Sequence, residues 1–271
     1  MKSIPVPFPM APCLSEEKRH RYILTALTYG FSQLERKPIG EGSLSIVAYG
    51  PSLRDTWKSI KRPMLTMSGA HDFLISHGVV PDFHCDVDPR PHKTQMLTPH
   101  RDVAYFMGTV CNPAMWEKLK DFNVTTWHCI NGPDTPRFLL KFNPGSLMLS
   151  GWSCIGLTAL HLGGVMGYDH FEIHGMDGSW RDKERTAGPH LGTLHGEIEE
   201  EIYGRKFFTS RLMLNANTEL QYILQNFPLF CVFHGDGFNQ WWVRHQELVT
   251  CAVEGTDQAE TIRRMRWRVA A

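Results

Sequence analysis

Residues 43–69, SLSIVAYGPSLRDTWKSIKRPMLTMSG, contain the pattern that decides the fold. They begin with a short apolar run that ends at Gly50, continue with a polar, helix-like segment after Pro51, and finish with a second apolar run that ends at Gly69. Proline is common in the first turn of a helix, and glycine after a strand permits a tight turn. The stretch therefore predicts a strand, a helix and a second strand, the repeating unit of a parallel sheet.

The same alternation of strand-like and helix-like segments continues along the chain. It predicts an α/β fold with a Rossmann-like, mostly parallel sheet and helices on both faces, an N-terminal helix and a C-terminal helical extension. A hairpin that turns at Gly204 is expected at residues 197–210. Other strands are predicted at 81–88, 102–108, 124–130, 170–178 and 229–237, and other helices at 15–36, 70–78, 89–97, 112–122, 150–168 and 211–227.

No linker or internal repeat clearly divides the chain. We expect an N-terminal arm and helix over residues 1–42, a Rossmann-like domain over 43–240 and a helical tail over 241–271. The Pro- and Gly-containing stretch after residue 130 is expected to be a loop. Trp241 and Trp242 are expected to be exposed, where they could belong to a homo-oligomer interface.

The composition limits the kinds of partner. The chain has 28 basic and 28 acidic residues among 271, so its net charge indicates neither a nucleic acid nor a membrane surface. A basic segment at residues 263–268 could grip nucleic acid, but it also fits the solvated end of a helix. Seven scattered cysteines and the lack of an apolar run of about 18 residues predict a cytoplasmic protein without a membrane span.

Polar residues follow the predicted strands, where parallel sheets place their ligands. Asp86 and Asp88 in PDFHCDVDPRPH are two apart, so alternation along a strand would put both carboxylates on one face, where they could bind one divalent cation or one ribose. The alternative is that Asp88 caps the next helix while Asp86 pairs with Arg90. The spacing leaves both interpretations open.

Two further turns could hold phosphate. Gly50, Pro51 and Ser52 follow a strand, so backbone N–H groups and a hydroxyl could face a ligand, although an ordinary turn with Ser52 capping its helix explains them too. The segment SGWSCIGLTALHLGG, from Ser150, has a Ser-Gly turn that could open a close-packed helix with free N–H groups. Asp177 ends the next strand and fits either a site or a turn.

These motifs occur in the order YGPSL, GVVPDFHCDVDPRP, SGWSCIGLTALHLGGVMGYDHFEIHGMDGSW and GPH. Together they resemble the family of 6-hydroxymethylpterin diphosphokinase-like proteins, which includes the motility-associated-factor flagellin glycosyltransferases and is distantly similar to the bacterial CMP-sialyltransferases. The resemblance covers residues 43–240 and implies a nucleotide-dependent transferase there. In its sialyltransferase relatives a loop histidine acts as general base, and His190 is the matching residue, with His195 as the alternate.

The resemblance also implies a role for each strand end. Asp177 and Asp88 would join His190 in the catalytic group, and Asp86 with Asp88 would hold Mg²⁺ if the reaction needs it. The nucleotide would be bound by Gly50, Pro51, Ser52, Ser68, Gly69, Asn112, Ser150, Gly151, Trp152 and Ser153.

Two reactions follow from this resemblance. The favoured one is glycosyl transfer from a nucleotide-activated, CMP-type sugar with a histidine base, because the Ser-Gly segment and the His-bearing loop match more closely. The alternative is Mg²⁺-dependent transfer of diphosphate from ATP to a pterin-like hydroxymethyl acceptor, which the paired aspartates favour. A non-catalytic nucleotide-binding module is the second alternative, and the acceptor is not indicated.

Overall fold

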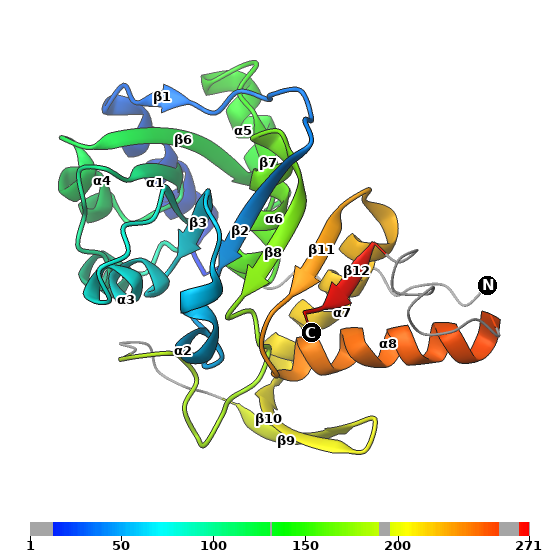
Figure 1. Ribbon diagram of the computed structural model, residues 1–271. Coiled ribbons are helices and arrows are strands. Elements are labelled where there is room, and N and C mark those ends of the chain that lie inside the picture. The colour runs from blue at the N-terminus through cyan, green and yellow to red at the C-terminus, as the bar shows by residue number, and fades with distance from the viewer. Residues whose placement is uncertain (1–12, 131, 190–195, 255–265, 271) are drawn as a thin grey trace.

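The computed structural model describes residues 13–130, 132–189, 196–254 and 266–270 of the chain (Figure 1). Its centre is a ten-stranded sheet in which every pairing is parallel. This confirms the predicted Rossmann-like α/β fold. The strands are β1 (Ser32–Gln33), β2 (Gly42–Val47), β3 (Met64–Met67), β4 (Phe83–Asp86), β5 (Ala104–Gly108), β6 (Asn123–Ile130), β7 (Met148–Ser150), β8 (Tyr168–His174), β11 (Phe230–Phe233) and β12 (Trp267–Val269).

The strand order reverses at β2. The order across the sheet is β1-β6-β5-β4-β3-β2-β8-β11-β12, with β7 also beside β6. From β2 the chain adds β3 to β6 on one side, and then returns to add β8, β11 and β12 on the other side. The crevice outside the carboxyl ends of β2 and β8 is therefore the topological switch point, where such sheets bind ligands.

Helices cover both faces of this sheet. Apolar residues of β5 and β6 pack with α1 and α4 on one face, whereas β2, β3 and β8 pack against α6 on the other. The helices are α1 (Glu16–Thr28), α2 (Leu53–Thr56), α3 (Ala70–Ser76), α4 (Pro113–Leu119), α5 (Thr135–Phe142), α6 (Ile155–Val165), α7 (Arg211–Asn226) and α8 (Phe238–Glu254), with 3-10 helices η1 (Trp57–Ser59) and η2 (Pro91–Met96). Among the described residues, no helix is both long and apolar enough to cross a membrane.

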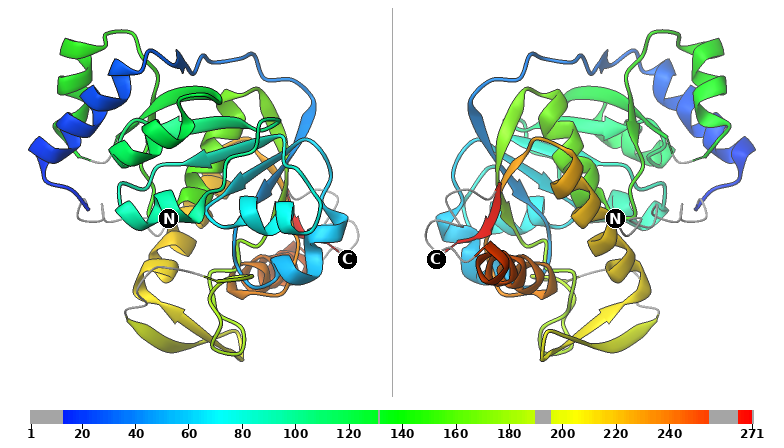
Figure 2. Two further views of the ribbon diagram at one scale, coloured as in Figure 1. Left: turned by 90° about the vertical axis from the view of Figure 1, so that its left-hand side faces the viewer. Right: turned by 90° about the vertical axis from the view of Figure 1, so that its right-hand side faces the viewer.

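A hairpin of β9 (Glu197–Ile202) and β10 (Arg205–Ser210) projects from the body of the molecule (Figure 2). Its two-residue turn consists of Tyr203 and Gly204, with φ angles of 51° and 75°. Positive φ at both positions gives the turn that suits the right-handed twist of a hairpin. The predicted hairpin and its turning point are confirmed.

Several predicted elements differ from those of the structure. The N-terminal helix ends at Thr28, not at residue 36, and β1 follows it. The stretch expected to be a loop contains α5 and β7, which the proline and glycine content concealed. The expected helical tail corresponds to α8, which begins at Phe238, but the chain then adds β12 to the sheet beside β11.

The two tryptophans of α8 are not the exposed pair that the sequence predicts. Trp242 is buried in the core, and Trp241 is half-buried with its indole N–H donated to the carbonyl of Ile202, 2.9 Å away. The prediction of an exposed aromatic pair is wrong because α8 packs these side chains against the core and the hairpin. The two tryptophans therefore give no support to an interface.

Candidate functional site

The turn after β2 and the turn after β8 meet at the switch point. Ser52 donates its backbone N–H to one oxygen of Asp177 (2.8 Å) and its hydroxyl to the other (2.5 Å). Gln240, in α8, donates to the same carboxylate at 3.2 Å. The structure thus brings Asp177 to the Gly50–Ser52 turn, as the sequence suggests, but the carboxylate occupies the donors that were predicted for phosphate.

Glycines make this contact possible. A Cβ atom on Gly50 would lie 2.6 Å from Oδ2 of Asp177, and one on Gly237 would lie 2.5 Å from the Asp177 Cβ. Asp177 and Ser52 are both buried, and burial raises the pKa of Asp177 above its usual value although the hydrogen bonds from Ser52 lower it. We name this enclosed contact the Ser52–Asp177 clamp.

A small cavity of about 100 Å³ adjoins the clamp on the side of the hairpin. Arg181, one of its lining residues, pairs with Asp55 and Asp236 at 2.5 Å each. The cavity can admit a small polar group next to Pro51. Its lining consists of Pro51, Asp177, Ser179, Trp180, Arg181, Arg205, Lys206, Phe207, Phe208, Asp236 and Gly237.

A second polar group lies at the carboxyl ends of β3 and β4. Lys93, which is buried in η2, donates its ammonium to the Ser68 hydroxyl (2.8 Å) and lies 3.9 Å from Asp88. Ser68 has a φ of 52°, a left-handed conformation that is uncommon for a residue with a side chain. Backbone strain of this kind concentrates at functional sites. We name Ser68, Asp86, Asp88, Arg90 and Lys93 the strand-end group.

The two aspartates of this group have different surroundings. β4 ends at Asp86, so strand alternation does not extend to Asp88. One oxygen of Asp86 accepts the N–H groups of Val87 (2.7 Å) and Asp88 (2.9 Å). Its other oxygen has no hydrogen bond within the described chain. Burial raises the pKa of Asp86.

Asp88, not Asp86, is the partner of Arg90. The Arg90 guanidinium donates to both oxygens of Asp88 at 2.5–3.1 Å, and its backbone N–H donates at 3.0 Å. Burial alone would raise the pKa of Asp88, but Arg90 and the charge of Lys93 outweigh it and hold the pKa below its usual value. The suggestion that Asp86 pairs with Arg90 is therefore wrong.

Gly69 and Asn112 complete the strand ends on this side. The ring of Tyr49 occupies the space of a Gly69 side chain, since a Cβ there would lie 2.6 Å from its Cδ1. Asn112 caps α4 through the N–H of Ala114 (3.1 Å) and donates to the carbonyl of Pro89 (3.2 Å). Both residues shape the edge beside the strand-end group, while their predicted contact with a nucleotide stays a prediction.

The segment from Ser150 to Ser153 does not open a helix as predicted. Ser150 ends β7, and the N–H of Gly151 extends the sheet by donating to Ile130 at 3.0 Å. The N-cap of α6 is Cys154, because the preceding residues remain extended beside β6.

The donors of Ser153 are already taken by a carboxylate. Its N–H and hydroxyl donate to the two oxygens of Glu219, in α7, at 2.8 and 2.9 Å, and Asn215 donates to the same hydroxyl. Burial raises the pKa of Glu219 despite the hydrogen bonds from Ser153. This Ser153–Glu219 clamp repeats the chemistry of the first clamp. Trp152 lies half-buried beside it and packs against Tyr222.

The loop after β8 returns across the ends of β2 and β3. The Arg54 guanidinium donates to the carbonyls of Thr186 (2.9 Å) and Ala187 (2.7 Å), and the Tyr49 hydroxyl donates to that of Pro189 (3.2 Å). His190 and His195 lie outside the described residues. The last described residue before them, Pro189, is thus held at the carboxyl end of β2.

Some residues of the site carried no signal in the sequence. Lys93, Gln240 and Glu219 sit in helices whose polar positions look like ordinary surface positions. Tyr49 lies one residue before the Gly50–Ser52 turn and Arg54 two residues after it. A motif extended by two residues on each side would have included both. The contacts that define the clamps join residues 66 and 125 positions apart, which no local pattern reports.

The arrangement of this chain defines a class: a Rossmann-like α/β protein with polar groups gathered at the switch point and along the neighbouring strand ends. A sequence model described as "6-hydroxymethylpterin diphosphokinase MptE-like" matches residues 20–183. Because the match covers well over half of the chain, this protein belongs to the 6-hydroxymethylpterin diphosphokinase MptE-like family. The resemblance predicted from the motifs is confirmed.

A solved structure shares the fold. The MAf glycosyltransferase from Magnetospirillum magneticum AMB-1 matches with a TM-score of 0.60 and 17% sequence identity, over 81% of this chain and 37% of that one. The chain thus spans little more than a third of that protein, and at this identity the likeness concerns the fold. No curated protein matches the sequence. The family description and the name of the solved structure both denote transferases.

Proposed function

We propose that this protein is a nucleotide-dependent transferase, and that it transfers a glycosyl group from a nucleotide-activated, CMP-type sugar with His190 as the general base. The observation that supports this proposal is the anchoring of the loop after β8. Tyr49 and Arg54 hold residues 186–189 at the carboxyl end of β2, and Pro189 is the residue before His190 in the sequence.

The strand-end group offers the charge that such a reaction needs. Arg90 and Lys93 provide cations beside β4. A nucleotide that leaves as a phosphate anion is stabilised by fixed positive charges of this kind. Because Arg90 and Lys93 also neutralise Asp88, this carboxylate does not require a metal to be stable.

The proposed chemistry is a single displacement. The imidazole of His190 removes the proton of an acceptor hydroxyl, and the acceptor oxygen bonds to the anomeric carbon of the sugar. The bond between that carbon and the phosphate oxygen breaks, and the nucleotide leaves with the electron pair. The acceptor is defined here only as a hydroxyl compound.

Thermal-shift measurements with CMP, CDP, UDP, GDP and ATP test the proposal, each with and without Mg²⁺. A ligand that binds only the folded state raises the melting temperature. We expect CMP to raise it without metal, and H190A to lower the turnover of a CMP-sugar by about 10²-fold or more while leaving the CMP shift intact. Retained turnover in H190A would show that another group is the base.

A specific observation favours a second function, transfer of diphosphate from ATP. Asp86 keeps one carboxylate oxygen without a hydrogen bond in the described chain, next to Asp88 and Lys93. Mg²⁺ in nucleotide sites commonly uses one or two carboxylates together with substrate phosphates, and these residues fit that donor set. Asp86 and Asp88 would then hold the ion, which neutralises charge on the transferred group.

The same screen separates the two functions. An ATP shift that needs Mg²⁺ and disappears in D86N would favour diphosphate transfer, because this substitution removes a metal ligand and keeps the shape of the side chain. D82N provides the matched control, since Asp82 lies before β4, where it pairs with Arg62. A complete lack of shift with all five nucleotides would point instead to a binding module for another ligand.

A further inference from the structure

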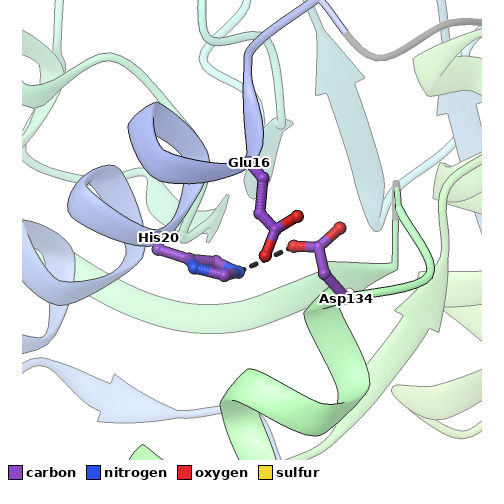
Figure 3. A group of neighbouring side chains, drawn as sticks. All are labelled: Glu16, His20 and Asp134. Carbon is purple, nitrogen blue, oxygen red and sulfur yellow. Dashed lines mark hydrogen bonds and ion pairs between the residues drawn. The ribbon is translucent and has the colours of Figure 1, made fainter.

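We propose that Glu16, His20 and Asp134 form a binding site for a first-row divalent transition metal, such as Zn²⁺. The side chains come from α1 and from the residue that precedes α5, and one ligand atom of each lies within 4.8 Å of the others (Figure 3). The site is separate from the strand-end group and does not depend on the proposed transferase activity.

The local structure explains why the three side chains converge. Glu16 and His20 are four residues apart in α1, so both point from the same face of the helix. Asp134 follows β6 and occupies the N-cap position of α5, although it accepts no capping hydrogen bond there. Its carboxylate is therefore directed to α1, where His20 Nε2 lies 2.7 Å from Oδ2.

Neighbouring residues hold these ligands in place. The His20 ring stacks on Phe138 with 3.9 Å between ring centroids and 7° between planes, which fixes the direction of Nε2. Arg19 binds the other oxygen of Asp134, so Oδ2 remains the one directed to the metal. Gly132 leaves the necessary room, because a Cβ there would lie 2.6 Å from both the Arg19 guanidinium and Asp134 Oδ1.

Charge and donor type indicate the class of metal. Glu16 and Asp134 carry two negative charges and Arg19 one positive charge, so a divalent cation changes the net charge of the group from −1 to +1 when His20 is neutral. One imidazole nitrogen with two carboxylate oxygens suits a first-row transition metal better than Mg²⁺ or Ca²⁺, which prefer oxygen ligands alone. Bonds of about 2.0–2.2 Å require Nε2 and Oδ2 to move apart to about 3.3 Å, a small adjustment.

The site is accessible and has structural consequences. His20 and Asp134 expose 21% and 14% of their side chains, so an ion can enter from solvent. A bound ion would tie α1 to the segment after β6. Two residues after His20 in α1, the Tyr22 hydroxyl contacts Asn112, which also binds Pro89 next to the strand-end group. Metal binding would therefore fix α1 beside the strand ends.

Calorimetric titration of the full chain with Zn²⁺, after removal of metals with a chelator, tests the proposal. We expect one saturable site in the parent protein, weakened by about 100-fold or more in H20A because a ligand is lost outright. In E16Q, a change at an exposed position that leaves the fold undisturbed, binding should weaken by about tenfold, since a neutral amide replaces a charged ligand. Titration with Co²⁺ should give a visible absorption spectrum in the parent protein that H20A lacks.

Matched controls distinguish this site from general surface binding. His170 is exposed and pairs with Asp169 at 2.6 Å, which makes it a comparable histidine and carboxylate on the surface, and H170A should bind Zn²⁺ as the parent does. E17Q changes the neighbouring acid of α1 and should also leave binding unchanged. The proposal is overturned if the parent shows no saturable Zn²⁺ site, if H20A and E16Q both bind like the parent, or if H170A abolishes binding.

Discussion

The Ser52–Asp177 clamp and the Ser153–Glu219 clamp share one chemistry in different surroundings. In each, the N–H and the hydroxyl of a serine donate to the two oxygens of a carboxylate from a distant part of the chain. The first clamp is fully buried at the switch point, whereas the hydrogen bonds of the second are only partly buried. Asn215 also reaches the second clamp, whereas Gln240 binds the first.

This difference separates an enclosed contact from one whose serine donors are partly exposed to water. At the first clamp, Gly50 and Gly237 bring backbone against Asp177 and leave no space for another anion. At the second, Ser153 is only partly buried, although Glu219 itself is buried. Each clamp thus uses a serine from a turn that follows a strand, and the two clamps differ in how far that serine is buried.

Removal of the carboxylate from each clamp should have the largest effect on stability and should show the difference between the two clamps most clearly. We expect D177A to lower the free energy of unfolding by about 3 kcal/mol or more, because the buried donors of Ser52 and Gln240 lose their acceptor. E219A should lower it by about 1–2 kcal/mol, since water can reach the donors of Ser153. Urea denaturation measures both values.

Asp236 provides the control for these two changes. It is exposed and pairs with Arg181 on the surface, so D236A should stay within about 1 kcal/mol of the parent protein. If D177A and E219A lower the free energy of unfolding by equal amounts, the proposed difference between the Ser52–Asp177 clamp and the Ser153–Glu219 clamp is wrong.

Replacement of Gly50, beside the first clamp, or of Gly156, in α6, by alanine should have an intermediate effect on stability. In G50A the new Cβ would meet Asp177 and the backbone of Gly175, neither of which can move, so we expect a loss of about 1–3 kcal/mol. In G156A, in the first turn of α6, the Cβ would meet the flexible end of Met176, and the gain in helix propensity offsets the contact. Thermal unfolding of both variants, with G164A as a control in open space, provides the test.

The smallest expected effect is the one that the two carboxyl groups have on how stability depends on pH. Burial raises the folded-state pKa of both Asp177 and Glu219, so the folded protein keeps protons that the unfolded chain has lost. Each carboxyl therefore contributes stability that is fully present below its unfolded pKa and is lost as the pH rises through its folded pKa. We expect the D177N and E219Q variants to lose less stability than the parent protein as the pH rises.

The urea concentration at the unfolding midpoint, measured between about pH 4 and pH 8, shows how much stability each variant loses as the pH rises. The loss should be smaller in D177N than in E219Q, because the carboxyl of Asp177 is more deeply buried. A parent protein whose stability rises steadily with pH through this range would contradict the assignment of raised pKa values to the two clamps.

Much of the fold was predictable because its signals are local. Short apolar runs located the strands β2, β3, β4, β5, β6, β8 and β11, and the first helix begins at Glu16, close to the predicted residue 15. α5 and β7 were missed because Pro136 and Gly145 suggest a loop, although proline is tolerated in the first turn of a helix. The three-residue β12 is too short to have a pattern of its own.

The sequence predicted where the residues of the candidate site lie better than it predicted which residues contact one another. Strand ends gave the places of Asp86, Asp88 and Asp177 correctly, since parallel strands place their carboxyl ends along one edge. The partners of these carboxylates were not predictable, because Arg90 could reach either aspartate from the sequence alone. The structure shows that Asp88 is the partner and that β4 ends before it, at Asp86.

The sequence by itself determined the α/β class, the order of the main strands and the family, because these depend on periodicity and on short motifs in a fixed order. The tertiary structure decided which polar residues meet. Ser52 and Ser153 look alike as turn serines in the sequence, yet Ser52 is buried where it binds Asp177, whereas Ser153 is only partly buried where it binds Glu219. The physical reason is that burial and the direction of a hydrogen bond depend on elements far away in the chain, which local patterns do not encode.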